Sequence, residues 1–394
     1  VLSRRTNHGQ IVTWRRRASK LVVVRILRSA VLLLATVVVT YGCSDESTQS
    51  SAAGGADAGG AGGSGGGQVG GAGPCITGSG GGTVRVASWN IGAVGAPGTP
   101  QHEAALAVLL RIGADVVGVN EVNGSAEKGY FGNLAFDAGY DNTLVSDAVS
   151  PFGTQRNGFM SKLPIVDEGL HSAAGLSGDA AANDITRLIP ELTVDVNGCP
   201  LTVVVNHWKA GFNRTQVFRR AVESFRVGQV VAARDGTTQP LVFPGDVNDE
   251  IDAIPVTPVP FFDVPMAVPP GYVVGADIQA LLDSRDGIYN DAFTLLLSEP
   301  PGVTAVDALQ LDGDDATKPD SGRRLDYVFV SAALAKGTPS GEVYDSADEG
   351  RAGGLPKIGS ALSADTSLAA SDHLLVFADL TVPACECTEA NGSR

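Results

Sequence analysis

The sequence predicts an α/β domain with antiparallel elements that begins near residue 83. From there, short runs of β-branched residues alternate with stretches whose apolar residues recur at helical spacing. An Asn197-Gly198 pair lies between two such runs, and this pair is the signature of a tight hairpin turn. The alternation indicates an α/β protein, and the hairpin adds antiparallel strands to it.

The first expected elements are a strand, a helix and a second strand. Residues 83–89 are expected to form the first strand because Val84 and Val86 recur at the two-residue period of a strand. Residues 101–112 carry apolar side chains at the three- and four-residue spacings of an amphipathic helix. Residues 115–120 are rich in valine and are expected to form the next strand.

The later elements follow the same patterns. The expected hairpin pairs residues 185–196 with residues 201–206, and a long amphipathic helix is expected at 215–233. The remaining expected strands, in chain order, lie at 241–243, in the run 323–330 and at 374–380.

Composition and charge divide the chain into segments. The 394 residues are 43% hydrophobic, which is enough for one large core once a glycine-rich portion is set aside. The formal net charge is −15, and residues 1–42 hold eight basic residues and no acid, so the rest of the chain carries −23. A protein this acidic does not attract polyanions by bulk charge, so a phosphate substrate would need local basic residues and metal ions. The expected segments are a signal peptide at 1–43, a linker at 44–82, a catalytic domain at 83–383 and a tail at 384–394.

The N-terminal segment has the pattern of an export signal. Basic residues precede an uncharged, mostly apolar run at 29–44, whose length of about 15 residues suits a signal peptide better than a membrane span of about 20. The run ends in Val39-Thr40-Tyr41-Gly42-Cys43, which resembles a bacterial lipobox, so Cys43 is the expected site of a lipid anchor. An ordinary signal peptide cleaved nearby is the alternative. With either signal the protein is expected to be exported, as a membrane-anchored lipoprotein or in secreted form, and the Gly/Ala/Ser-rich linker is expected to act as a flexible tether.

The other cysteines are Cys75, Cys199, Cys385 and Cys387. An even number of cysteines in an exported protein favours disulfides. Zinc binding is the alternative, but one Cys-x-Cys pair with the other two cysteines far away is poor zinc spacing. A Cys385–Cys387 bridge would be strained, so we do not expect it.

Polar residues follow the ends of the expected strands. Strand ends that gather carboxylates, amides and histidines can form a site, because a rigid sheet holds oxygen ligands and bases in fixed geometry. Each residue alone has a simpler interpretation: Asn90 as a turn residue, His207 as a structural histidine, and residues 245–249 as an acidic turn. Taken together and in this order, they indicate an active site. The full set is Asn90, Glu121, His207, Asp246, Asn248, Asp326, Asp372 and His373.

The order of these motifs resembles the endonuclease/exonuclease/phosphatase family, which includes deoxyribonuclease I, bacterial sphingomyelinases and inositol polyphosphate phosphatases. The resemblance covers about residues 83–382, and its most specific parts are Ser-Asp-His, Gly-Asp-x-Asn and Asn-His-x-Lys. The segments that carry it are SWNIG at 88–92, VGVNEV at 117–122, RNGFMSKLPI at 156–165, VNHWKAG at 205–211, FPGDVND at 243–249, RRLDYVFVS at 323–331 and ASDHLLV at 370–376.

The resemblance implies a fold and a metal site. The fold would be a four-layer α/β sandwich, as in deoxyribonuclease I, in which two mixed sheets pack face to face between outer helices, with the site at one end. Asn90, Glu121 and Asp372 match the positions that bind Mg²⁺ or help to bind it, and Mn²⁺ or Ca²⁺ would suit the same oxygen ligands. The first and last strands of this fold are neighbours, so we expect Cys75 to pair with one of Cys385 and Cys387, and Cys199 to pair with the other.

The resemblance also assigns roles in the hydrolysis of a phosphodiester. Such a reaction needs a metal to offset phosphate charge, an acid–base pair, and donors to the phosphate oxygens. Whether Asp246 or a histidine activates the water stays open, and no carboxylate partner for His207 is evident. By position, the matched roles are Asp246 and Asn248 for the water and a phosphate oxygen, His207 and His373 on either side of the phosphate, Asp326 to orient His373, and Asn157, Arg156 and Lys209 for substrate binding.

The substrate is expected to be nucleic acid, since VNHWKAG most resembles the extracellular nucleases of the family, and the protein is expected to be a monomer. A sphingomyelinase-like lipid phosphodiesterase is the first alternative, because the insertion at 256–274, with Phe261, Phe262 and Tyr272, could form an exposed apolar hairpin. An inositol-phosphate phosphatase and a non-catalytic binding module are the others, and the module would predict losses among the site residues. Eight basic residues near the site favour a polyanion, although those of the long helix could instead form a solvated face: Lys209, Arg214, Arg219, Arg220, Arg226, Arg156, Arg323 and Arg324.

Overall fold

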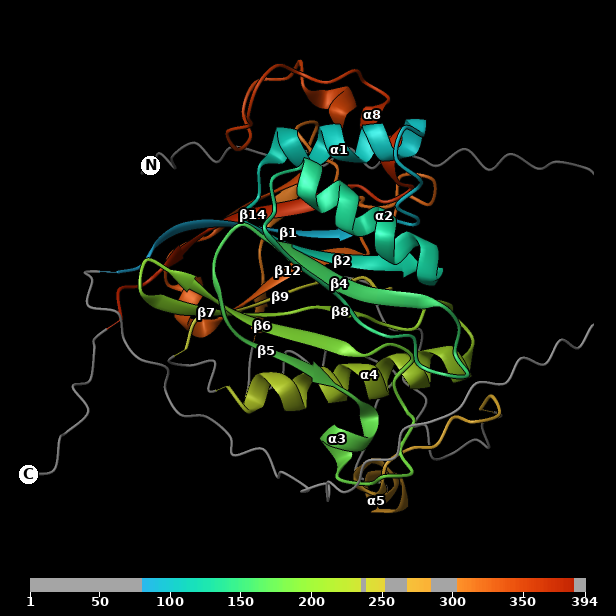
Figure 1. Ribbon diagram of the computed structural model, residues 1–394. Helices are drawn as coiled ribbons and strands as arrows, with labels where there is room; N and C mark the ends of the chain where they lie inside the picture. The colour runs from blue at the N-terminus through green and yellow to red at the C-terminus, as the bar shows by residue number, and fades with distance from the viewer. Residues whose placement is uncertain (1–79, 235–238, 252–267, 285–302, 386–394) are drawn as a thin grey trace, which may run out of the picture. The chain divides into compact units, whose positions relative to one another are not determined.

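The computed structural model describes residues 80–234, 239–251, 268–284 and 303–385 (Figure 1). The expected signal segment, nearly all of the linker and most of the tail lie outside the described residues. The described residues belong to one compact unit, Val69–Arg394. No helix in the described part of the chain is long and apolar enough to cross a membrane.

Two mixed β-sheets form the centre of the domain. Each sheet contains both parallel and antiparallel pairs. In the first sheet, for example, β1 pairs in parallel with β2 and antiparallel with β14, and in the second, β7 pairs in parallel with β9 and antiparallel with β6. The first sheet, in spatial order, contains β11 (Ala308–Leu309), β13 (Ser340–Tyr344), β14 (Leu375–Val382), β1 (Gly82–Asn90), β2 (Val116–Asn123), β4 (Gln155–Ser161) and β3 (Asn142–Val145). The second contains β10 (Val303–Ala305), β12 (Asp326–Ser331), β9 (Leu241–Asp246), β7 (Cys199–Val204), β6 (Ile189–Val196) and β5 (Ile165–His171), with β8 (Asn206–His207) pairing with β9.

Successive side chains of a strand point to opposite faces of the sheet and pack into two different apolar cores. Along β1, Val84 and Val86 face a core between the sheets, which also contains Leu192 of the second sheet. Ala87 and Trp89 point to the opposite face, where they pack with residues of a helix. This alternation follows from the two-residue period of a strand and places apolar residues on both faces of the sheet.

Helices cover the outer face of each sheet (Figure 1). Helices α1 (Pro100–Ile112), α2 (Gly124–Asp137) and α8 (Thr366–Ala370) lie over the first sheet, while α3 (Ala173–Ser177) and α4 (Arg214–Ala232) lie over the second. The result is the four-layer α/β sandwich expected from the sequence, so that prediction is confirmed. The remaining described helices are α5 (Ala276–Ser284), α7 (Ala332–Ala335) and the 3-10 helix η2 (Ser346–Asp348).

Local capping residues determine where the two long helices begin and end. The Thr99 side chain caps the start of α1, Pro100 occupies its first turn, and Gly113 ends it in the left-handed conformation with φ 64°. Helix α4 begins with a capping box between Asn213 and Gln216. Both helices lie within two residues of their expected bounds.

The expected hairpin forms, but its first strand is shorter than the sequence suggested. Strand β6 begins at Ile189 and not at residue 185. Thr186 is held outside the ladder because both its backbone N–H and its hydroxyl donate to Glu223 of α4. The apolar pattern at 185–188 therefore reflects burial against a helix and not strand pairing.

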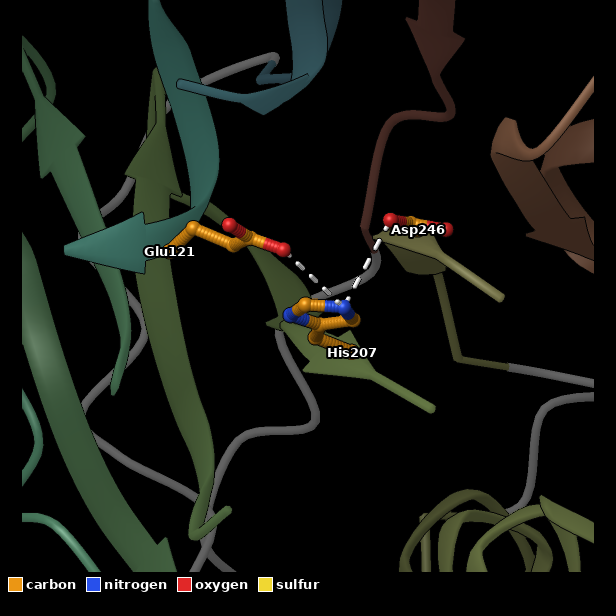
Figure 2. A group of neighbouring side chains, drawn as sticks. All are labelled: Glu121, His207 and Asp246. Carbon is orange, nitrogen blue, oxygen red and sulfur yellow. Dashed lines mark ion pairs between the residues drawn. The ribbon is translucent and has the colours of Figure 1, made fainter. Parts of the chain in front are cut away.

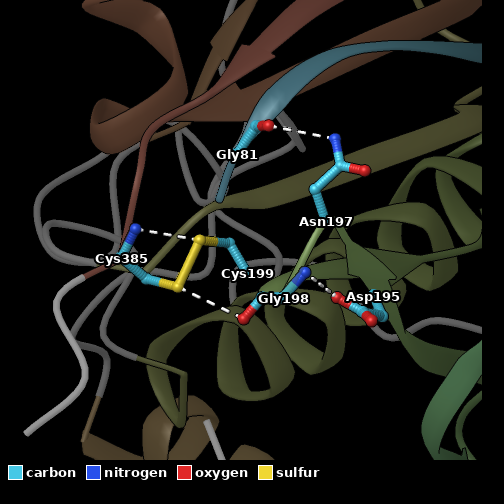
Figure 3. The surroundings of a disulfide bond; sticks show 6 residues. All are labelled: Gly81, Asp195, Asn197, Gly198, Cys199 and Cys385. Carbon is cyan, nitrogen blue, oxygen red and sulfur yellow. Dashed lines mark hydrogen bonds between the residues drawn. A yellow bond between two sulfur atoms is a disulfide. The ribbon is translucent and has the colours of Figure 1, made fainter. Parts of the chain in front are cut away.

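A disulfide joins the hairpin turn to the last strand's end (Figure 3). Cys199 is bonded to Cys385, which confirms the expected pairing of Cys199, while the expected partners Cys75 and Cys387 lie outside the described residues. In the same turn, the Asn197 amide donates to Gly81 O at 3.1 Å. Strand β7 begins at this turn, and the predicted site residue His207 follows the other end of the strand. The disulfide therefore lies at the end of the strand opposite the predicted site.

Candidate active site

The strand ends of both sheets meet at one edge of the sandwich. Asn90 lies at the end of β1, opposite residue 120 of the parallel strand β2, and Glu121 follows directly. In the second sheet, His207 of β8 lies opposite Asp246 of β9 in parallel register, and Asp326 at the start of β12 faces the same Asp246. Hydrogen bonds between the two sheets connect these ends into one site.

One cluster contains Glu121, His207 and Asp246 (Figure 2). The His207 Nε2 atom lies 3.7 Å from Glu121 Oε1 and 3.5 Å from Asp246 Oδ2. Ligand atoms of all three residues lie within 4.8 Å of one another, so the cluster could hold a metal ion. The Asn90 amide nitrogen donates to Asp246 Oδ2 at 2.9 Å and to Glu121 Oε1 at 3.2 Å, while its oxygen accepts from Gly92 N. In this arrangement Asn90 holds the two carboxylates together.

The backbone at Glu121 has an uncommon conformation. Its φ is 65°, in the left-handed region that residues other than glycine seldom adopt. The pairing of β2 with β4 shifts register between Val119 and Val122, so Glu121 lies in a β-bulge. Bulges change the direction of a side chain next to a site, and this one turns the Glu121 carboxylate toward His207. Asn248, with φ 52°, is a second site residue in the left-handed region, and its amide donates to Trp208 O.

A buried asparagine that sequence analysis missed joins the two sheets beneath the cluster. The Asn120 amide nitrogen donates to Asn157 Oδ1 and to Asn206 O, both at 3.0 Å, and its oxygen accepts from Asp246 N at 2.9 Å. Asn157, expected to reach the phosphate, is buried, and its own amide nitrogen donates to Leu188 O. The structure therefore places Asn157 in the layer that supports the site.

The second cluster contains Asp246, Asp326 and His373. His373 Nδ1 lies 2.7 Å from Asp326 Oδ2, with the residues 5% and 0% exposed. The buried Thr317 hydroxyl also donates to Asp326 Oδ2 at 2.7 Å and accepts from Asp326 N, which orients the carboxylate. The pair expected from the sequence is present, and Thr317 is an additional partner. Asp246 belongs to both clusters.

The two histidines have opposite electrostatic environments. Burial lowers the pKa of His373, but the charge and hydrogen bond of Asp326 outweigh burial and raise the pKa to about 9, so His373 is protonated at neutral pH. Burial lowers the pKa of His207 well below its ordinary value, and the Arg187 charge adds to this, so His207 is neutral. Its Nδ1 has no hydrogen-bond partner among the described residues.

Asp246 lies between these groups. Burial, together with repulsion from Asp326, raises the pKa of Asp246 to about 7, against the opposing effect of His373. A carboxyl group with a pKa near neutrality can exchange protons at physiological pH. The site thus contains a protonated histidine, a neutral histidine and a titrating carboxyl group.

Asp372 occupies a different position from the clusters. Its side chain is exposed and forms an ion pair with Lys318, a residue that sequence analysis missed. Burial raises the pKa of Asp372, but the hydrogen bond from Lys318 outweighs this effect and lowers the pKa overall. Asp372 is in neither of the two acid–histidine clusters found in the described residues.

Three of the four arginines of α4 do not form the surface expected from the sequence, and only Arg214, at the first position of the helix, is exposed. Arg219, Arg220 and Arg226 are buried, so neither a polyanion-binding face nor a solvated face describes them. Arg226 pairs with Asp184 and with a carboxylate of α5. Arg220 pairs with Asp249 at 3.0 Å. These side chains connect α4 to neighbouring loops, and an amphipathic pattern alone could not distinguish this role from exposure.

The other basic residues lie around the site. Lys209 is half-buried, and burial and the Arg187 charge lower its pKa. Arg156 donates to Thr154 O. Arg187, which sequence analysis missed, is buried beside the site and donates to His207 O at 3.3 Å. The charge of an arginine inside an otherwise apolar run was the signal that could have identified it.

The fold and the sequence motifs are those of a family of hydrolases. The chain belongs to the endonuclease/exonuclease/phosphatase family, whose model matches residues 87–373, and members of this family are hydrolases that act on phosphodiester bonds. The expected family is therefore confirmed.

Solved structures similar to this chain are distant in sequence. An endonuclease/exonuclease/phosphatase from Beutenbergia cavernae is 21% identical, with a TM-score of 0.48, covering 76% of this chain and 72% of that one. The human Nocturnin catalytic domain is 16% identical, with a TM-score of 0.46, covering 76% and 94%. The Staphylococcus aureus beta toxin is 15% identical, with a TM-score of 0.44, covering 75% and 99%. No curated protein matched the sequence.

Proposed function

We propose that the protein is an exported, Mg²⁺-dependent phosphodiesterase whose substrate is nucleic acid. The observation that carries the proposal is the meeting of two acid–histidine clusters that share Asp246 at one edge of the sandwich. One cluster offers oxygen ligands, and the other offers a protonated histidine, which are the groups that phosphodiester hydrolysis requires.

The first cluster fits a divalent ion. Glu121 is partly exposed and Asp246 is buried beside it, so their carboxylates provide two hard oxygen donors, and the neutral His207 can offer Nε2. Mg²⁺ matches oxygen donors best, and Mn²⁺ accepts the nitrogen as well. A bound ion would neutralise charge on the phosphate oxygens. Asn90 would hold the carboxylates, and Asp372 would have to leave Lys318 to reach the ion.

The protein's own groups account for binding and proton transfer. The protonated His373 would bind a phosphate oxygen or donate a proton to the leaving group, and Asp326 would keep its ring in place through Nδ1. Asp246, beside the first cluster, would position the attacking water or accept its proton. Asn248 donates its backbone N–H to Asp246 Oδ1 and its side-chain amide to Trp208 O, so these two bonds would hold it next to the water that Asp246 positions.

Assays with purified protein test the proposal. Plasmid DNA, RNA, sphingomyelin and an inositol phosphate should be compared with Mg²⁺, Mn²⁺, Ca²⁺ and EDTA. We expect cleavage of nucleic acid with Mg²⁺ and its loss with EDTA. Cleavage of sphingomyelin or inositol phosphate alone would replace the proposed substrate, and no hydrolysis of any diester would leave a binding module.

The lipid alternative has less support from the described residues. Tyr272 of the proposed apolar hairpin is buried and packs edge-on against Phe152 and Phe218. Phe261 and Phe262 lie outside the described residues. The catalytic positions are all retained, which argues against a non-catalytic module.

Export and anchoring are further parts of the proposal. The Cys199–Cys385 disulfide supports an oxidising compartment. Cell fractionation with and without Cys43→Ser tests the lipid anchor, which the substitution should release from the membrane fraction. Size-exclusion chromatography tests the proposed monomer.

A further inference from the structure

An exposed phenylalanine follows the candidate catalytic residue His207 closely in the chain. Phe212 is 73% exposed and is located five residues after His207, in the loop that leads into α4. The loop backbone is held in place, since the buried Arg220 donates to Lys209 O and to Gly211 O, both at 2.8 Å. The domain therefore presents this ring on a fixed loop.

Helix capping does not explain the exposed ring. Phe212 directly precedes Asn213, the N-cap residue of α4, and an apolar residue there often packs against the fourth residue of the helix, here Val217. Such a contact would cover much of the ring. With 73% of Phe212 exposed, most of the ring is left available to solvent or to a ligand.

A cation covers part of the ring. The Arg323 guanidinium carbon lies 4.6 Å from the centre of the Phe212 ring, and Arg323 Nε donates to Glu250 Oε2 at 2.9 Å. Arg323 is three residues before Asp326, and Glu250 is four residues after Asp246. The segments that contain His207, Asp326 and Asp246 therefore also supply the aromatic ring, the arginine over it and the glutamate that binds the arginine.

We propose that Phe212, backed by Arg323, stacks against the nucleobase next to the scissile phosphate and so selects single-stranded or frayed nucleic acid. This inference rests on the proposed phosphodiesterase function. Flat aromatic rings bind bases of any sequence by stacking, and a nearby arginine adds attraction for the phosphates. A duplex keeps its bases stacked on one another, so an unpaired base fits the ring better.

Nucleic acid fits this surface better than a membrane does. Insertion of Phe212 into lipid would carry Arg323 and Glu250 toward the apolar phase, and removing such an ion pair from water is costly. Stacking of a base leaves both charged groups in water. The ring and its charged partners are therefore suited to a polar, planar ligand.

Steady-state kinetics on two oligonucleotides of equal length test the proposal. One is single-stranded oligothymidylate, and the other carries abasic residues on either side of the cleavable linkage. For Phe212→Ala we expect KM for oligothymidylate to rise roughly 5- to 100-fold, because the variant loses the stacking of one base. The preference for oligothymidylate over the abasic oligonucleotide should fall by a similar factor. Phe212→Trp should restore the preference, and Phe212→Leu should not.

A matched control is available in Phe136, which is 80% exposed near the end of α2. Phe136→Ala should leave both KM values unchanged, and thermal melting should show that every variant is folded. An unchanged preference in Phe212→Ala would overturn the proposal, as would a loss of binding to phosphatidylcholine vesicles with unchanged oligonucleotide kinetics. Failure of the wild-type protein to cleave either oligonucleotide would instead contradict the proposed function itself.

Discussion

The His373–Asp326 pair gives the sharpest test of the proposed chemistry. Replacing Asp326 with asparagine keeps the side-chain volume but removes the charge that holds His373 protonated. Burial, which lowers the pKa of His373, would remain. The Asp246 charge, which raises the pKa, would also remain, so the pKa of His373 in Asp326→Asn should fall from about 9 toward its ordinary value of 6.5.

The size of the effect follows from this change in pKa. At pH 8, a group with a pKa of 9 is about 90% protonated, whereas a group with a pKa of 6.5 is about 3% protonated. If protonated His373 is required, kcat at pH 8 should fall roughly 30-fold in Asp326→Asn. The alkaline limb of the pH profile should also move toward acid. His373→Ala should lose roughly 10²–10⁴-fold in kcat below pH 9, where wild-type His373 is protonated, and the difference should shrink at higher pH.

The same pair makes stability depend on pH. Protonation of His373 stabilises the folded state because the pKa of His373 is higher in the folded than in the unfolded protein. This stabilisation is complete below pH 6.5 and is lost as the pH rises through about 9. The difference in pKa corresponds to roughly 3 kcal/mol. Urea denaturation at pH 6 and at pH 9.5 should show a loss of this order in the wild-type protein and a much smaller loss in Asp326→Asn.

The double variant decides whether the two residues act together. Since Asp326 is expected to act through His373, Asp326→Asn with His373→Ala should be little slower than His373→Ala alone. Measurements of kcat from pH 6 to 10 and an NMR titration of His373 provide the comparison. If the two losses multiply, or if the pKa of His373 stays near 9 in Asp326→Asn, the reasoning is refuted.

Three further predictions concern the metal, the disulfide and the buried arginine. Glu121→Gln should raise the Mg²⁺ concentration for half-maximal activity at least roughly tenfold, and activity that survives exhaustive EDTA treatment would contradict a metal role. Replacing Cys199 and Cys385 with alanine should lower the free energy of unfolding by up to about 5 kcal/mol, since the bridge closes a separation of 186 residues. The kcat should stay unchanged because the bridge lies away from the site, and an altered kcat in the folded variant would count against this placement. Arg226→Met should lower stability by roughly 3–5 kcal/mol in urea denaturation because Asp184 stays buried without its cation, and unchanged stability would show that the pair is not a structural one.

The sequence was sufficient for the order and approximate bounds of the main elements. The helices α1 and α4 carry their own capping residues, and the strands β1 and β14 have strong local patterns, so short-range information determines them. The start of β6 was wrong because the bonds of Thr186 to Glu223, 37 residues away, replace strand pairing there. Contacts of that range are not visible in a local pattern.

Most of the acids and histidines of the candidate site were also visible in the sequence, but the residues that connect them were not. Asn120 lies one position before the predicted Glu121, yet its three bonds to other segments make it the link between the two sheets. Asn120 faces the second sheet by regular strand alternation with Val116 and Gly118, and the bulge then turns the Glu121 carboxylate toward the same site. Glu121 in the left-handed conformation carries a cost of order 1–3 kcal/mol, which the surrounding pairing must offset. In a regular strand the Glu121 side chain would point to the face opposite that of Asn120. Asn90 would then still bind Asp246 but would lose Glu121 as its second carboxylate partner. The strained backbone is therefore part of how the site is assembled, and strand periodicity, which assumes regular geometry, could not predict it.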